Sequence, residues 1–169
     1  MKDSEVLKNL IQIRKSSYPK DFSTEEISID ELNEVLNSAE FAPSHKKTKP
    51  WRFQVFKNDS KIELGEELMK VYKNSIENST EKKLQSIEEK FLKSDAVVSI
   101  SVNFSGKIPE WEEIAATSMA VQNMYLTCTA LEIGCYWSSP SYIEKMEKHI
   151  GLEENQRCIG LFYMGKLKK

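Results

Sequence analysis

Residues 110–131 read EWEEIAATSMAVQNMYLTCTAL, and from Ile114 to Leu131 they contain no charged side chain. This uncharged stretch approaches the length of a membrane-spanning helix, but hydroxyl and carboxamide side chains recur along it. They are Thr117, Ser118, Gln122, Asn123, Thr127 and Thr129. The pattern therefore favours a long helix in the core of a soluble protein, covered on most sides by a sheet or by a second chain.

Shorter segments on both sides of this helix show two patterns. β-Branched and aromatic runs predict strands at residues 53–56, 96–102, 135–137 and 158–164. Apolar residues at helical spacing predict helices at residues 4–14, 28–42, 61–78, 81–93 and 141–150. Helices outweigh strands, and pairs of helices separate several of the strands. This order predicts an α+β fold in layers, with a sheet around the long buried helix.

Two of the predicted helices begin with a capping-box pattern. Ser28 is followed three residues later by Glu31, and Ser141 is followed at the same spacing by Glu144. In such a box each side chain accepts a hydrogen bond from the backbone N–H of the other residue. Gly151 stands where a helix over residues 141–150 would end in a left-handed conformation.

Length and composition narrow the class of protein. A chain of 169 residues is long enough for one domain with its own core, and we place no boundary within residues 1–169. The net charge of −2 argues against a dedicated nucleic-acid binder, which would usually be strongly basic. The charged N-terminus has no apolar run behind it, so we expect no signal peptide and no membrane association. Cys128, Cys135 and Cys158 lack metal-ligand spacing and are typical of reduced thiols in a cytoplasmic protein.

Three segments have the residue types of a binding site. Arg14, Lys15 and Ser16 could hold phosphate oxygens, although cations at a helix end also simply complement the helix dipole. Residues 42–53 (APSHKKTKPWRF) combine a histidine, lysines and an arginine with aromatic side chains, and could surround an anionic or planar ligand. The alternative is a solvated charge run in which Trp51 and Phe53 anchor the following strand.

The third segment, residues 134–140 (GCYWSSP), follows the long helix. Small residues after an aromatic one let backbone N–H groups approach a ligand, but an ordinary turn with a buried tryptophan fits the segment equally well. The chain has no G-x-G-x-x-G turn, Walker loop, H-E-x-x-H or C-x-x-C motif. With His45 and His149 as its only histidines, it also cannot form a histidine-rich metal site.

Taken together and in this order, the three segments resemble the nitroreductase family of flavoproteins in its compact form. Arg14-Lys15-Ser16 resembles the family's N-terminal Arg-Arg-Ser, and residues 42–53 resemble the loop A-P-(S/D)-H-K-x-x-x-P-W-x-F. Trp111-Glu112 and the helix after it resemble the central dimer helix. Residues 133–139 resemble the G-x-x-W segment beside the flavin ring.

The resemblance implies a layered fold with a mixed sheet and an entwined homodimer that holds FMN at the subunit interface. It also implies ping-pong hydride transfer from NADH or NADPH to flavin N5 and on to a nitroaromatic, quinone or similar acceptor, with no protein residue as the chemical catalyst. The cofactor-binding residues it implies are Arg14, Lys15, Ser16, Ser44, His45, Lys47, Trp137, Ser138, Ser139 and Lys166.

Each of these residues has an implied role. Arg14 and Ser16 would bind the phosphate end of FMN, while Lys15, His45 or Lys47 would place positive charge near the N1–C2=O edge of the ring. Backbone N–H groups from Trp137 to Ser139 would bond the polar edge and N5. The resemblance also implies that Ser44 and His45 lie in the loop that reaches the flavin of the partner chain, and that Lys166 takes the place of a C-terminal cation at the phosphate.

Two positions depart from the family pattern. Two functions other than reduction also remain open. Tyr18 stands where larger members carry a basic residue, and Glu132 replaces the first glycine of a G-x-G. The same motifs would serve a flavin-binding module for storage, sensing or delivery. A basic loop that docks nucleic acid or an acidic partner is a third hypothesis, which the net negative charge weakens.

Overall fold

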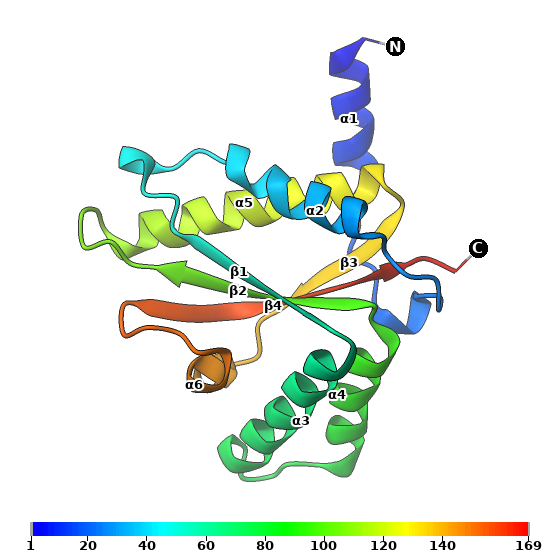
Figure 1. Cartoon of the computed structure of the whole chain (residues 1–169), viewed down its shortest axis with the longest axis vertical. Coiled ribbons are helices and arrows are strands. Elements are labelled where there is room, and N and C mark those ends of the chain that lie inside the picture. The colour runs from blue at the N-terminus through cyan, green and yellow to red at the C-terminus, as the bar shows by residue number, and fades with distance from the viewer. Residues whose placement is uncertain (1, 169) are drawn as a thin grey trace.

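The computed structural model describes residues 2–168 as a four-stranded sheet with helices on both faces (Figure 1). The helices are α1 (Asp3–Ile13), α2 (Ile29–Ser38), α3 (Asn58–Ser75), α4 (Glu81–Lys93), α5 (Glu110–Ala130) and α6 (Glu147–Ile150). The strands are β1 (Trp51–Lys57), β2 (Ala96–Asn103), β3 (Ile133–Ser138) and β4 (Gln156–Lys166). Short 3₁₀ turns are η1 (Pro19–Asp21), η2 (Ala39–Phe41), η3 (His45–Lys47) and η4 (Ile143–Met146). The α+β class predicted from the sequence is confirmed.

The strand order is β1-β2-β4-β3, and all three pairings are antiparallel. The expectation of a mixed sheet is therefore wrong for the strands of residues 2–168. The reason lies in the connections: Lys57, the last residue of β1, pairs with Ala96, the first residue of β2. The α3–α4 hairpin thus leaves and re-enters the sheet at the same end, which makes the flanking strands antiparallel.

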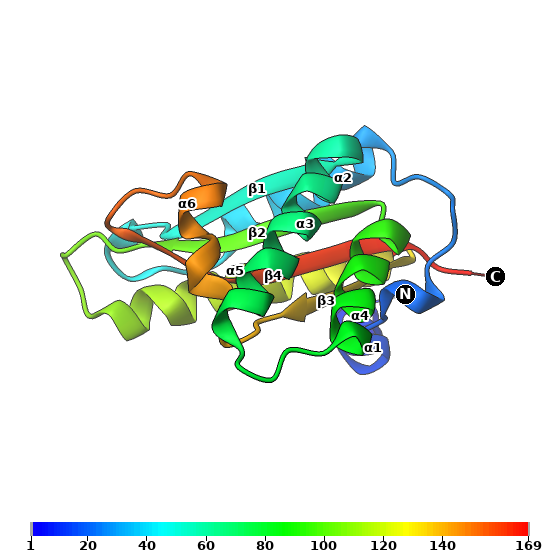
Figure 2. The same ribbon diagram turned by 90° about the horizontal axis from the view of Figure 1, so that it is seen from below.

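The two faces of the sheet have separate cores. On one face α5 and α2 pack over residues such as Val98, Ile100 and Phe162. On the other face α3, α4 and η4 pack over Val97, Leu161 and other residues that alternate with the first set (Figure 2). Because successive side chains of a strand point to opposite faces, a strand between two cores is buried on both sides, as β2 is from Ala96 to Val102.

Helix α5 has the buried position that its uncharged sequence predicts, but only over part of its surface. Ala116, Ala120, Val121 and Met124 lie in the core beneath α2. Trp111 and other side chains on the opposite side of the helix remain exposed. No helix of residues 2–168 combines the length and apolar character needed to cross a membrane.

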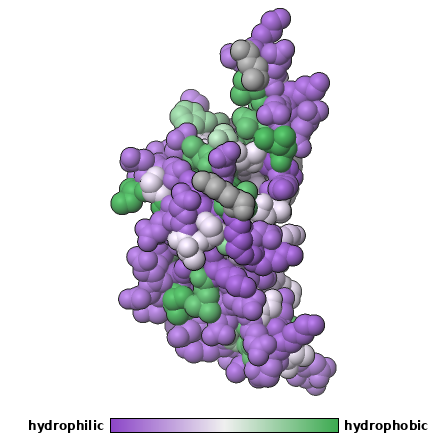
Figure 3. All heavy atoms as spheres, turned by 90° about the vertical axis from the view of Figure 1, so that its right-hand side faces the viewer, coloured by the Kyte–Doolittle hydropathy of each residue, from purple (hydrophilic) through white to green (hydrophobic). Residues whose placement is uncertain are grey.

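Helix α1 stands out from the rest of the molecule and contains no buried residue (Figure 1). Its apolar side chains Val6, Leu7 and Ile11 are 42%, 53% and 54% exposed. In the space-filling view apolar atoms lie among polar ones on this projecting part (Figure 3). An apolar stripe of this kind normally packs against something, and in the isolated chain most of it faces solvent.

One of the two predicted capping boxes forms and the other does not. The Ser28 Oγ accepts the N–H of Glu31, and the Glu31 carboxylate accepts the N–H of Ser28. The helix predicted over residues 141–150 is instead the turn η4 followed by the short α6, so Ser141 caps nothing. Gly151 does have the left-handed conformation expected of it, with φ 79°.

Candidate functional site

The segment after α1 runs beside β3, which is an edge strand of the sheet. The Ser17 N–H donates to the Cys135 carbonyl at 2.9 Å, and the rings of Tyr18 and Tyr136 lie 5.0 Å apart. This pairing brings residues 14–18 next to Trp137, which is 121 positions after Ser16 in the sequence. Two of the three segments predicted from the sequence are therefore neighbours in space.

Arg14, Ser16 and Trp137 meet at the side chain of Tyr125 on α5. The Arg14 guanidinium lies over the Tyr125 ring, 5.3 Å from its centroid. The Trp137 N–H donates to the Tyr125 hydroxyl at 2.7 Å, and the Ser16 side chain lies near the same hydroxyl. Sequence reasoning missed Tyr125, because it occupies one position in a long, mostly apolar helical pattern and nothing local marks it.

Arg14 has no carboxylate within ion-pair distance among residues 2–168. Its planar fork of N–H donors is held by a cation–π contact, which uses the face of the guanidinium and leaves the N–H groups at its rim free. A partly buried guanidinium of this kind is suited to a phosphate or another oxyanion.

Trp137 is held rigidly by the strands beneath it. Its indole N–H donates to the Ile159 carbonyl at 3.2 Å, and its ring covers Gly160. A Cβ atom at Gly160 would lie 1.9 Å from the indole nitrogen, so only glycine leaves room for the ring. The Trp137 side chain therefore forms a fixed wall at the edge of the sheet.

The backbone donors of this segment differ from those expected. The Trp137 N–H is already bonded to Tyr125 and points away from β4. Donors alternate along an antiparallel strand, so the N–H of Ser138 faces β4, where Ser138 pairs with Leu161. The Ser139 N–H lies just beyond the strand and is the next donor that can face a ligand. Trp137 is thus not an available backbone donor.

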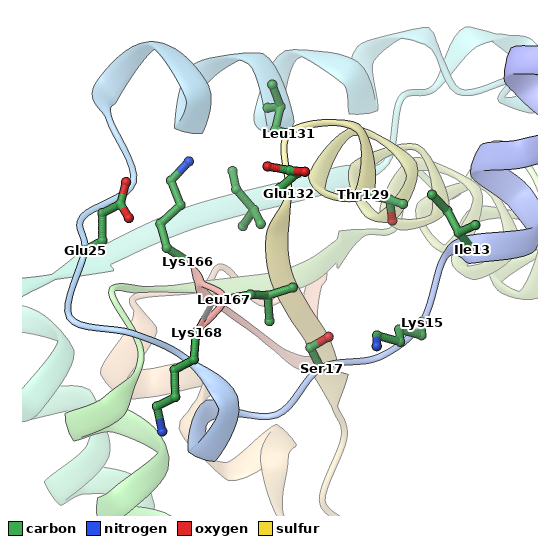
Figure 4. Close-up of a pocket in the computed structure, with 11 residues that line it drawn as sticks. Ile13, Lys15, Ser17, Glu25, Thr129, Leu131, Glu132, Lys166, Leu167 and Lys168 are labelled. Carbon is green, nitrogen blue, oxygen red and sulfur yellow. The ribbon is translucent and has the colours of Figure 1, made fainter.

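Lys15 points to the other side of the segment from Arg14 and Ser16. It lines a cleft of about 420 Å³ together with Ser17, Lys166, Leu167 and other residues (Figure 4). In Figure 4 Leu167 lies between Lys15 on one side and Lys166 and Lys168 on the other. The cleft is therefore lined by cations from both ends of the chain.

Lys166 is partly neutralised by α2. Its Nζ contacts the Glu31 carboxylate at 2.5 Å. The hydrogen bond from Lys166, followed by that from the Ser28 N–H, lowers the pKa of Glu31. A phosphate near Lys166 would have to compete with this carboxylate, which makes Lys166 a weaker anion ligand than the sequence suggests.

Lys90 on α4 is a cation near the site that sequence reasoning missed. Its Nζ lies 5.7 Å from the centroid of the Tyr136 ring, on which Tyr18 also packs. Burial, with a smaller effect from Lys83, lowers the pKa of Lys90. In an amphipathic helix rich in lysine, no local signal separates this half-buried residue from solvated ones.

The basic loop is built on the N-terminal half of α5. His45 Nδ1 lies 2.5 Å from the Glu112 carboxylate, and the Lys46 Nζ donates to the Lys107 carbonyl at 3.1 Å. Lys46, Lys47 and Lys49 have positive φ angles of 50°, 53° and 43°, a backbone conformation that residues other than glycine rarely adopt. Such strain persists only where the surroundings impose it, and it is common at binding sites.

The aromatic residues of this loop anchor it, as the alternative interpretation held. Trp51 is buried and its indole N–H donates to the Glu40 carboxylate at 2.8 Å. Phe53 packs against the core on the α5 face. Lys49 contacts the same Glu40 carboxylate at 2.9 Å. Lys46, Lys47 and Arg52 make no ion pair within the described part of the chain, and of these Lys46 and Arg52 donate to backbone carbonyls.

One chain does not bring all three segments together. Glu112, which holds His45, and Tyr125, which holds Arg14 and Trp137, lie 13 residues apart on α5. At 1.5 Å per residue this corresponds to about 20 Å along the helix. Ser44, His45 and Lys47 are therefore remote from Arg14, Ser16 and Trp137 of the same chain.

The three cysteines form no disulfide among residues 2–168. Cys128, Cys135 and Cys158 are buried and unpaired, as expected from the sequence. Burial raises the pKa of the Cys158 thiol to about 11 and also raises that of Cys128. Thiols with raised pKa values are poor nucleophiles at neutral pH.

Comparison with known proteins identifies the family of this chain. Residues 11–166 match the model of the nitroreductase family. YfhC of Bacillus subtilis, named by inference as an NAD(P)H nitroreductase, is 27% identical over 95% of this chain and 84% of its own length.

Solved structures share the fold. The crystal structure of a nitroreductase-like family protein from Bacillus cereus is 26% identical, with a TM-score of 0.85 over 96% of this chain and 86% of that one. NfnB of Mycobacterium smegmatis, described as an FMN-dependent nitroreductase in complex with NADPH, is 16% identical and shares the fold at a TM-score of 0.76, over 98% and 89% of the two chains. The match to the family model covers nearly the whole chain, and the protein therefore belongs to the nitroreductase family.

Proposed function

We propose that this protein is an FMN-dependent NAD(P)H oxidoreductase that reduces a nitroaromatic, a quinone or a similar electron-poor acceptor. The observation that carries the proposal is the meeting of Arg14, Ser16 and Trp137 at the edge of β3. It is supported by the family membership and by the name of the relative YfhC, which refers to NAD(P)H.

The donors at this edge fit a phosphorylated, planar ligand. Arg14 offers an unpaired guanidinium for a phosphate, and Ser16 offers a hydroxyl for a phosphate or a polyol chain. The fixed indole of Trp137 gives a flat apolar wall, and Ser139 offers a backbone N–H at its side. Lys15 and Lys90 add positive charge on either side of the segment.

FMN in this place would accept a hydride from NADH or NADPH and pass reducing equivalents to the acceptor. The protein's residues would bind and orient it. Arg14 and Ser16 would hold the phosphate end. The cations near the ring would stabilise the negative charge that reduction builds up at its N1–C2=O edge.

A second copy of the chain would complete the site. Ser44, His45 and Lys47 lie on the loop beside Glu112, which is about 20 Å along α5 from Tyr125 of the same chain. The apolar residues of α1, together with Phe41, Trp111 and Met119, are exposed and require a partner surface. We infer a homodimer in which the loop of each chain reaches the FMN of the other. His45 is oriented for this role by Glu112.

Anaerobic titration tests the function. Purified protein is saturated with FMN, freed of excess, and mixed with NADH or NADPH in separate experiments. We expect about one FMN per chain, with bleaching of the flavin absorption by at least one nicotinamide and recovery on addition of a quinone or nitroaromatic. Binding without bleaching by either nicotinamide would leave only the flavin-binding module. Absence of FMN binding would contradict both the oxidoreductase and the flavin-binding module.

A further inference from the structure

Tyr125 connects parts of the candidate site that come from distant parts of the sequence. It lies on α5, its ring faces Arg14, and its hydroxyl faces Ser16 and Trp137. Arg14 and Ser16 follow α1, whereas Trp137 belongs to β3. The side chain therefore joins three separate elements at one point.

The ring of Tyr125 sets the direction of Arg14. It is fixed from behind by Phe162 of β4, at 5.0 Å between ring centroids and an interplanar angle of 88°. Its other contact is the Arg14 guanidinium at 5.3 Å. A cation–π contact orients the guanidinium and leaves its N–H groups free. A carboxylate partner would instead occupy those N–H groups.

The hydroxyl of Tyr125 sets the position of the other two residues. It accepts the Trp137 N–H at 2.7 Å, and the Ser16 side chain lies near it. A neutral phenol has one proton to donate and lone pairs to accept, so it can serve both partners at once. Burial raises the pKa of Tyr125, which keeps the phenol neutral at physiological pH.

We propose that Tyr125 is a positioning residue of the FMN site, which holds Arg14, Ser16 and Trp137 in the arrangement that the cofactor meets. This inference rests on the proposed function. Without the hydroxyl, the segment after α1 would be tied to β3 near this point only by the Ser17 N–H bond to Cys135 and by the packing of Tyr18. Part of the binding free energy of FMN would then be spent on ordering Ser16 and the Trp137 backbone.

The variant Tyr125→Phe removes the hydroxyl and keeps the ring, and with it the contacts to Arg14 and Phe162. We expect the Kd for FMN to rise about tenfold, because the Trp137 N–H loses its partner and Ser16 loses a polar neighbour. Amide exchange at Trp137 in the FMN-free protein should become faster by a similar factor. Tyr142→Phe, which removes a hydroxyl just before η4 in the other core, is the matched control and should change neither value.

A double-mutant cycle with Ser16→Ala separates positioning from general stability. If Tyr125 acts through Ser16, Tyr125→Phe should weaken FMN binding less in the Ser16→Ala background than in the wild type. Equal effects in both backgrounds would show that the hydroxyl acts through the Trp137 N–H and not through Ser16. A Kd of Tyr125→Phe within about twofold of the wild-type value would overturn the positioning role. Failure of the wild-type protein itself to bind FMN would instead refute the proposed function. The exchange rate of the Trp137 amide would still show whether the Tyr125 contact exists.

Discussion

At the scale of single residues, Glu132 carries backbone strain at the end of α5. Its φ angle is 55°, in the left-handed region that favours glycine, and it follows the last residues of the helix. A glycine at this position would avoid the strain, which for a residue with a Cβ costs about 1 kcal/mol or more.

We predict that Glu132→Gly raises the free energy of unfolding by about 0.5 kcal/mol, after the greater flexibility of glycine in the unfolded chain is subtracted. Chemical denaturation measures the change. Glu63→Gly, at an exposed right-handed position within α3, is the control and should lower stability by about 1 kcal/mol. Loss of stability in both variants would show that position 132 is not strained.

The Glu31–Lys166 contact predicts a pH dependence. Lys166 and the Ser28 N–H lower the pKa of Glu31 in the folded protein. The stability from this carboxylate is therefore fully present above the unfolded-state pKa of about 4.3, and is lost as pH falls through the folded-state value.

Glu31→Gln keeps an oxygen for the Ser28 cap and removes the charge. The difference in unfolding free energy between wild type and variant should be constant between about pH 5 and 8 and shrink below about pH 4. A difference that does not change with pH would mean that the ion pair contributes nothing.

At the scale of elements, the site depends on the contact between β3 and β4 at Gly160. The Trp137 ring occupies the space that a side chain at position 160 would fill. We predict that Gly160→Ala lowers stability by about 1–3 kcal/mol and also weakens FMN binding, because the indole must move.

Gly65→Ala provides the matched control. A Cβ there would press on Phe91 at 2.7 Å, in the α3–α4 hairpin and away from Trp137. It should destabilise the fold to a comparable degree and leave the Kd for FMN unchanged when both are measured well below the melting temperature. Equal losses of FMN binding in the two variants would show that stability, and not the position of Trp137, controls binding.

The elements also show how far the sequence predicts this structure. Ser28 and Glu31 form the predicted cap because Ile27 and Leu32 are buried beside them and fix the start of α2. The same pattern at Ser141 does not form a cap, because Tyr142, Ile143 and Met146 are buried in the core and the segment is a 3₁₀ turn. A local sequence pattern predicts a helix well where the buried residues recur at the helical period. It predicts a helix poorly where the core buries residues at a different spacing.

The sequence predicts the site residues that stand in motifs. It does not predict the residues that only the packing of the fold brings to the site. Arg14, Ser16 and Trp137 stand in recognisable sequence patterns, and the structure brings them together. Tyr125 and Lys90 lie in ordinary helical patterns and become neighbours of the site only through packing. Likewise, only the contact with Tyr125 shows that the Trp137 N–H is not available to a ligand.

At the scale of the whole molecule, we propose that two copies of the chain share each site. The site residues that one chain brings together lie around Tyr125. The loop with His45 packs against the opposite half of α5, at Glu112. In a dimer related by a twofold axis, a chain with Arg14→Ala paired with a chain with His45→Ala would form one intact site and one doubly altered site.

Mixed dimers of these two variants test that claim most directly, with NAD(P)H-dependent acceptor reduction measured at limiting FMN. Each variant alone should be strongly impaired, since every site lacks one group. After co-expression, random pairing should restore intact sites to about a quarter of the total, with a matching rise in rate. A rate no higher than the mean of the two parent variants would contradict the shared FMN site.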